Sequence, residues 1–117
     1  MADYTGRAHF FVAFRCPAEH EADGDSVFAQ HAEWMERTHP KDGDKALLQY
    51  TVSKSHDDEG NVLFLLSEVY ETKAGIDNHR KLAHDDEEDS RVNDLLALAD
   101  KCQTIGWGDA EVLHSLW

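Results

Sequence analysis

The chain has 117 residues and a formal net charge of −13 at pH 7, with 24 acidic side chains against 11 lysines and arginines. This length suits one domain, residues 1–117, around a single hydrophobic core. The charge argues against nucleic acid and anionic membranes as partners, because both would repel the protein. No apolar run approaches the ~20 residues of a membrane span, and the first residues lack the pattern of a signal peptide, so we expect no membrane partner and a cytoplasmic protein.

Cys16 and Cys102 are the two cysteines of the chain. Two cysteines are too few for a disulfide framework, and their spacing is not the CxxC of a zinc or redox site. We therefore expect two reduced, half-buried thiols.

The first half of the chain predicts a strand, a helix and a hairpin. Residues 7–16 alternate between two apolar faces, which is typical of a strand. Asp25 is a candidate N-cap for an amphipathic helix, whose apolar repeat stops before Pro40. Residues 45–55 and 62–71 alternate as strands on either side of the turn sequence DDEGN, and this pattern indicates a hairpin.

The second half predicts two helical stretches and a last strand. Thr72 is the expected N-cap of a helix that turns His79 toward the sheet. After the acidic run DDEED, residues 92–102 carry the apolar stripe of another helix. In the last segment, residues 103–117, the glycines on either side of Trp107 indicate a bend or bulge. The final strand is predicted to follow it.

The order strand, helix, strand, strand, helical segment, strand predicts a ferredoxin-like α+β fold, in which helices cover one face of a four-stranded antiparallel sheet. Residues 10–14 and 62–66 are nevertheless apolar on both faces. A sheet covered by helices on one side should be polar on the other. We therefore expect a homodimer in which two copies pack sheet on sheet.

An E-x-Y pair, an alanine near a helix start and an H-x4-H ending follow one another at Glu68, Tyr70, Ala74, His79 and His84. This pattern resembles the strand-to-helix signature of the antibiotic biosynthesis monooxygenase (ABM) family. The likeness extends over residues 7–84 and more loosely over the rest of the chain, and it implies a dimeric α/β barrel. It marks the fold more strongly than any one activity.

The resemblance also implies an oxygenase without a cofactor. In such members of the family the substrate is an ionised phenol or enol that reduces dioxygen directly, so neither a metal nor a flavin is required. Haem degradation, another activity of the family, is not expected here, because the acidic run at residues 85–89 would repel haem propionates.

The predicted catalytic residues are His79, Glu68 and His9. His79 suits the role of base or hydrogen-bond donor, since an unperturbed imidazole has a pKa of ~6.5; the alternative is a core histidine bonded to a backbone carbonyl or to Glu68. His9 matches a pocket position of the family by place, and its alternative is an exposed residue at the start of a strand.

Glu68 interrupts an otherwise apolar strand, so its carboxylate must be paired or protonated if it is buried. Either it orients a histidine, or it pairs with an arginine, for which the candidates are Arg7, Arg15 and Arg80.

A further set of side chains is predicted to line a substrate pocket between helices and sheet, although such residues are usually part of a core. These are Trp34, His31, Tyr50, Tyr70, Phe14 and His84. In a continuous helix His84 is rotated away from His79, so the two are not expected to share a metal ion. A surface or capping role is the alternative for His84.

The sequence contains no phosphate-binding loop, GxSxG elbow, HExxH motif or EF-hand loop, and its histidines do not follow a metal-binding spacing. We therefore expect no metal, and the resemblance implies that no cofactor is needed. The leading hypothesis is a small dimeric oxygenase acting on an aromatic or quinol-type molecule in an apolar pocket. The alternatives are a non-catalytic dimer that holds a small hydrophobic ligand or serves in stress, and a structural dimer with a filled interior.

Overall fold

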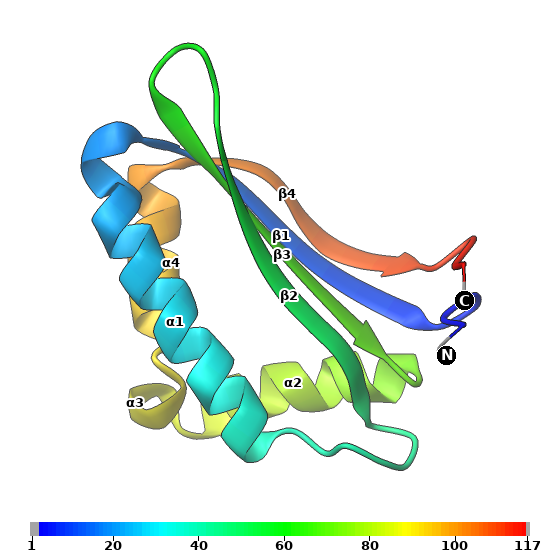
Figure 1. Ribbon diagram of the computed structural model, residues 1–117. Helices are drawn as coiled ribbons and strands as arrows, with labels where there is room; N and C mark the ends of the chain where they lie inside the picture. Colours follow the sequence, from blue (N-terminus) through cyan, green and yellow to red (C-terminus); the bar gives the residue numbers. More distant parts are fainter. Residues whose placement is uncertain (1–2, 117) are drawn as a thin grey trace.

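The computed structural model describes residues 3–116 and shows an antiparallel sheet with its helices on one side (Figure 1). In chain order the elements are β1 (Ala8–Pro17), the 3-10 turn η1 (Ala18–His20), α1 (Glu21–Thr38), β2 (Leu47–His56), β3 (Asn61–Tyr70), α2 (Lys73–Asp85), α3 (Glu87–Ser90), α4 (Val92–Lys101) and β4 (Gln103–Glu111). The strand order β2-β3-β1-β4, antiparallel throughout, confirms the predicted ferredoxin-like α+β fold. Among the described residues, no helix is long and apolar enough to cross a membrane.

The two central strands, β1 and β3, supply the inner face of the sheet. Alternate residues of β1 are buried from Phe10 to Cys16, and those of β3 from Val62 to Tyr70. Phe14 lies directly opposite Phe64 across the strand pair. The apolar side chains among them form one core with residues of α1, α2 and α4.

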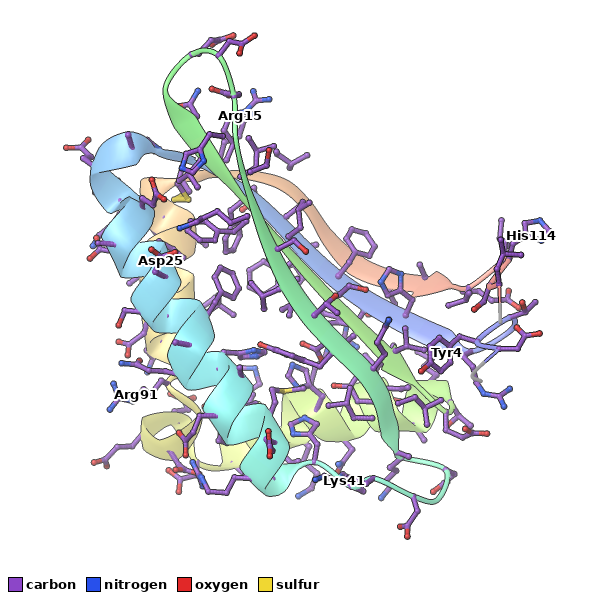
Figure 2. The ribbon with its side chains drawn as sticks, in the orientation of Figure 1. Tyr4, Arg15, Asp25, Lys41, Arg91 and His114 are labelled. Carbon is purple, nitrogen blue, oxygen red and sulfur yellow. A yellow bond between two sulfur atoms is a disulfide. The ribbon has the colours of Figure 1, made fainter. Side chains whose placement is uncertain are left out.

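Helix α1 begins earlier than predicted. It starts at Glu21, so Asp25 lies inside the helix rather than at its N-cap (Figure 2). The reason is the 3-10 turn after Pro17, which leads the chain directly into the helix and replaces the expected loop. Gly24 then lets α1 approach the sheet closely, because a Cβ there would lie 2.3 Å from the ring of Phe64.

The last strand also lies earlier than predicted. β4 ends at Glu111, and Gly106 and Gly108 lie within it rather than before it. Both glycines face Phe11 on β1, and a Cβ at Gly106 would lie 3.0 Å from the phenyl ring. The expected bulge is present as a register shift between β1 and β4. Of the segment predicted as strand, residues 112–116 continue without regular structure, and Trp117 lies outside the described residues.

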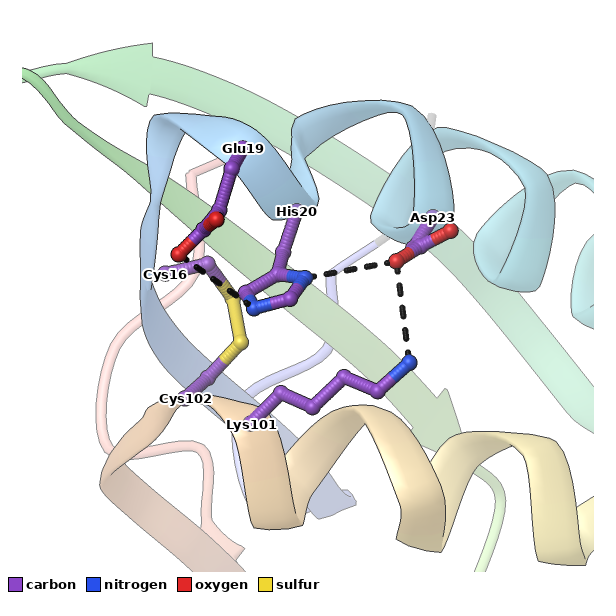
Figure 3. Close-up of a disulfide and its surroundings, with 6 residues drawn as sticks. All are labelled: Cys16, Glu19, His20, Asp23, Lys101 and Cys102. Carbon is purple, nitrogen blue, oxygen red and sulfur yellow. Dashed lines mark hydrogen bonds and ion pairs between the residues drawn. A yellow bond between two sulfur atoms is a disulfide. The ribbon is translucent and has the colours of Figure 1, made fainter.

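The prediction of two free thiols is wrong, because Cys16 and Cys102 form a disulfide (Figure 3). The two residues are 86 positions apart in the sequence, but the fold brings their Cα atoms to 4.5 Å. Cys16 lies at the end of β1, and Cys102 follows α4 directly before β4, which pairs with β1. The bond therefore links the N-terminal strand to the junction between the last helix and the last strand.

The outer face of the sheet, away from the helices, remains apolar at its centre. Leu65 is 44% exposed, and Phe11, Ala13 and Leu63 are half-buried. This confirms that both central strands are apolar on two faces, while the helices cover only one of them (Figure 1).

Candidate functional site

A cavity of about 140 Å³ opens between the inner face of the sheet and the helices. Its walls are largely apolar and aromatic, with Phe10, Leu66, Trp34 and Trp107 among them. Such walls suit a planar, hydrophobic molecule.

Two histidines, His31 from α1 and His79 from α2, bring polar atoms to this cavity. Their ring centroids are 5.9 Å apart and their planes are nearly perpendicular, at 79°. Both side chains are buried, at 8% and 7% exposed respectively. The structure therefore brings together two imidazoles whose positions in the sequence show no common spacing.

The start of α2 fixes the position of His79. Thr72 is the N-cap, as predicted, and its hydroxyl oxygen accepts a hydrogen bond from the backbone N–H of Ala74 at 3.1 Å. Gly75 allows the helix to lie against β3, because a Cβ there would be 2.6 Å from the ring of Tyr70. From that start, helical spacing turns Ile76 and His79 toward the sheet, as expected.

A chain of hydrogen bonds determines which nitrogen of His79 carries the proton. Thr38 donates its hydroxyl hydrogen to the carbonyl of Trp34 at 2.7 Å, so Thr38 Oγ1 must accept from His39 Nδ1, 3.0 Å away. A neutral His39 then has a bare Nε2, which accepts from His79 Nδ1 at 2.9 Å. Nε2 of His79 is left with a lone pair and no hydrogen-bond partner within residues 3–116.

A hydrogen bond to Nδ1 also orients the ring of His31. Its Nδ1 lies 2.7 Å from the hydroxyl of Tyr50 on β2, and no described residue bonds its Nε2. The phenol hydroxyl of Tyr50 can donate or accept this hydrogen bond. His31 can therefore adopt either tautomer, depending on whether a molecule in the cavity donates to Nε2 or accepts from it.

Glu68 lies next to His79 and is fully buried, at 0% exposed. Tyr70 donates its hydroxyl hydrogen to Oε1, whereas Oε2 has no partner among the described residues. Oε1 also lies 3.8 Å from His79 Nδ1.

None of the three predicted arginine partners forms an ion pair with Glu68 in the described part of the chain. The three candidates pair elsewhere, as Arg7–Glu71, Arg15–Asp57 and Arg80–Asp109. The other possibility raised by the sequence was that Glu68 orients a histidine. In the structure Glu68 does lie beside a histidine, His79.

Burial sets the protonation of the whole cluster. It lowers the pKa of His79 to about 2 and the pKa values of His31 and His39 to about 4. It raises the pKa of Glu68 to about 8, although the bond from Tyr70 opposes this shift. The pKa values of Tyr50 and Tyr70 also rise, mainly through burial and then through the nearby Glu68. At neutral pH the histidines are therefore uncharged and Glu68 is mostly protonated.

The structure gathers most of the predicted site residues and separates two of them. The cavity is lined by His79, His31, Trp34 and His84, and it is backed by Tyr50, Glu68 and Tyr70.

The other two predicted residues lie elsewhere. His9 is on the outer face of the sheet, where its Nε2 lies 2.8 Å from the hydroxyl of Ser67. Phe14 is in the core, packed on Phe28 and Trp107.

Sequence reasoning missed His39, which appeared only as the residue before a helix-stopping proline. It also missed Trp107, which was assigned to a bend but contributes an aromatic wall. The alternation of β4 could have indicated Trp107, since it lies opposite the inward-facing Val12. His39 lies beyond the end of α1, where the sequence has no periodic pattern to indicate which way a side chain points.

No protein-family model matches the chain, and no curated protein matches it by sequence. Among solved structures, the fold is similar to the crystal structure of SnoaB, a cofactor-independent oxygenase from Streptomyces nogalater. The superposition has a TM-score of 0.57 and covers 94% of this chain and 97% of SnoaB, with 17% sequence identity. At this identity the likeness establishes a shared fold.

Proposed function

We propose that this protein is a monooxygenase that needs no cofactor and acts on a small aromatic or quinol-type molecule in the cavity beside His79. The fold it shares with a cofactor-independent oxygenase supports the reaction class. The aromatic walls support the substrate class. The proposal depends most on one observation, the hydrogen-bond chain through Thr38 and His39 that leaves a lone pair on His79 Nε2.

In this proposal the substrate donates a hydroxyl or an activated C–H proton to His79 Nε2. A phenol has a pKa of ~10, so transfer to an imidazole with a pKa of about 2 would be unfavourable by roughly 11 kcal/mol. His79 alone is therefore too weak a base.

Ionised Glu68 removes much of this difficulty. A carboxylate 3.8 Å from His79 Nδ1 favours the imidazolium, because opposite charges at this distance stabilise each other strongly inside a protein. The predicted base thus becomes a pair, in which His79 takes the proton and Glu68 supplies the charge that holds it there.

The deprotonated substrate supplies the electrons. When a CH2 group beside an aromatic ring becomes C=O, it loses four electrons, and dioxygen accepts all four as one oxygen enters the product and the other leaves as water. The residues of this chain bind the substrate, take its proton and exclude bulk water from the anion.

Oxygen uptake tests the proposal. Metal-stripped protein is mixed with a hydroquinone or an anthrone, and dioxygen consumption is followed for the wild type, His79→Gln and the control His114→Gln. His114 is exposed and lies in the C-terminal segment, away from the helices (Figure 2). We expect the wild type and the control to agree and His79→Gln to lose at least ~100-fold, the usual scale of a lost acid–base group. Uptake no faster than in buffer, or unchanged in His79→Gln, would remove the catalytic role.

One observation favours a second function, the binding of a small hydrophobic ligand without chemistry. With a pKa of about 2, His79 would act only as a neutral hydrogen-bond acceptor in the aromatic cavity. Native mass spectrometry of gently purified protein would support this function if an unchanged small molecule remained bound.

A further inference from the structure

Three buried side chains from three elements converge beside the cavity: His31 from α1, Glu68 from β3 and His79 from α2. Each brings one potential ligand atom into a group in which all such atoms lie within 4.8 Å of one another. We infer that these three residues form a binding site for a divalent transition-metal cation. This inference goes beyond the proposed function and does not depend on it.

Each of the three side chains is held by a partner through one polar atom and keeps another atom free. The hydroxyl of Tyr50 bonds His31 Nδ1, His39 Nε2 bonds His79 Nδ1, and the hydroxyl of Tyr70 bonds Glu68 Oε1. Metal-binding histidines and carboxylates are typically oriented by such outer hydrogen bonds, which fix the tautomer and aim the free atom at the metal.

A cation bound through the free atoms would break none of these hydrogen bonds. No described residue bonds Nε2 of His31 or of His79. Glu68 Oε2 is fully buried and also without a partner in the described part of the chain. An unbonded carboxylate oxygen in the interior is unfavourable, and a metal ion is one ligand that would satisfy it.

The charge state of the cluster is compatible with a cation. The two imidazoles are neutral, which is the form that ligates metals. No cationic side chain is among the three ligands, so none of them would repel a bound cation.

Two imidazole nitrogens and one carboxylate oxygen suit Fe²⁺, Mn²⁺, Co²⁺ or Zn²⁺ better than Ca²⁺ or Mg²⁺, which prefer oxygen ligands throughout. Ligand atoms around such an ion are about 3 Å apart, given bonds of about 2.1 Å. The three side chains must therefore move closer together than their present spacing of up to 4.8 Å to hold an ion. Three protein ligands leave further positions open to water or to a molecule in the cavity.

Cobalt is a suitable probe, because Co²⁺ held by protein nitrogen and oxygen ligands absorbs visible light and Zn²⁺ displaces it. Metal-stripped protein is titrated with Co²⁺ as wild type, His31→Gln, His79→Gln, Glu68→Gln and the control His114→Gln. We expect one Co²⁺ per chain in the wild type and the control, and binding at least ~100-fold weaker in each ligand variant. Equal binding by all folded variants, or no binding by the wild type, would overturn the site.

A second measurement needs only the wild type and so does not depend on whether the variants fold. Mn²⁺ broadens NMR signals of nearby residues, and the acidic run at residues 85–89 is the natural competitor of a buried site in so acidic a protein. We expect the signals of His31 and His79 to broaden first. Broadening confined to the acidic run would overturn the inference.

Neither measurement uses a substrate. Loss of the metal site would therefore leave the proposed oxygenase reaction standing, and failure of oxygen uptake would leave the metal site standing.

Discussion

In water an imidazole holds a proton more tightly than a carboxylate, but burial reverses this order for His79 and Glu68. The pKa of His79 falls to about 2, and that of Glu68 rises to about 8. Each shift has desolvation as its largest cause, because a buried charge loses its solvation by water. At the scale of single residues, Glu68 is therefore the group of this pair that titrates close to neutral pH.

This difference predicts how the proposed oxidation depends on pH. The reaction needs ionised Glu68 beside His79, so the rate of oxygen uptake should rise with pH through about 8 and then level off. Glu68→Gln should be slow at every pH and show no such rise, because an amide does not ionise. The measurement is the pH profile of oxygen uptake at saturating substrate, after subtraction of the uncatalysed rate. The same rise in Glu68→Gln would assign the titration to another group.

The sequence could indicate part of this cluster. Helical spacing turned His79 inward, and Glu68 was conspicuous as the carboxylate of an apolar strand. The tautomer of His79 depends on His39 and Thr38, which reach it from the end of another helix. No local pattern encodes that contact, because it depends on how α1 and α2 meet.

At the scale of elements, the approach of α2 to β3 determines where His79 lies. Alanine usually stabilises a helix by about 1 kcal/mol relative to glycine. Gly75→Ala should instead destabilise the protein, by about 1–3 kcal/mol, because its Cβ would lie 2.6 Å from the ring of Tyr70 and 3.0 Å from the backbone carbonyl of Lys45. Urea unfolding measures the difference.

The matched control for this substitution is Lys73→Ala, an exposed position of the same helix. It should change the free energy of unfolding by no more than about 0.5 kcal/mol. If Gly75→Ala proved as stable as the control, the close contact between α2 and Tyr70 would not constrain the helix.

The disulfide links two elements that the sequence places far apart. Closing a loop of 86 residues removes conformational freedom from the unfolded chain, which corresponds to about 4–5 kcal/mol of stability. The double variant Cys16→Ala, Cys102→Ala should lose stability on this scale. A reducing agent should destabilise the wild type similarly and leave the double variant unaffected. Equal thermal midpoints for oxidised and reduced wild type would contradict this expectation.

No spacing rule could have paired these cysteines, because their proximity is a property of the topology. β1 lies between β3 and β4, so the end of the first strand meets the beginning of the last one. The ends of the last strand were also predicted poorly. Its alternating pattern continues to Leu116, but pairing with β1 ends at Ala8, opposite Glu111.

At the scale of the whole molecule, the order of strands and helices was predicted because each element has its own periodicity. The apolar content of β1 and β3 carried further information. Residues 10–14 and 62–66 have more apolar side chains than one layer of helices covers, and the structure leaves the excess on the outer face of the sheet.

We propose that a second copy of the chain covers this outer face. The centre of the face is apolar, with Leu65 at 44% exposed beside half-buried Phe11 and Leu63. Sheet-on-sheet packing would bury these side chains in both copies at once. Each copy carries a charge of −13, so association should strengthen as salt screens the repulsion between them.

Light scattering after gel filtration, at micromolar concentration and at low and high salt, measures this assembly. We expect a dimer for the wild type and a monomer for Leu65→Lys, because a lysine at the centre of an apolar interface must be desolvated in both copies. Leu96→Lys is the matched control, since Leu96 on α4 is also 44% exposed but lies on the helical side. A wild-type monomer, or a Leu65→Lys variant that dimerises as well as the control, would show that the outer face does not join two copies.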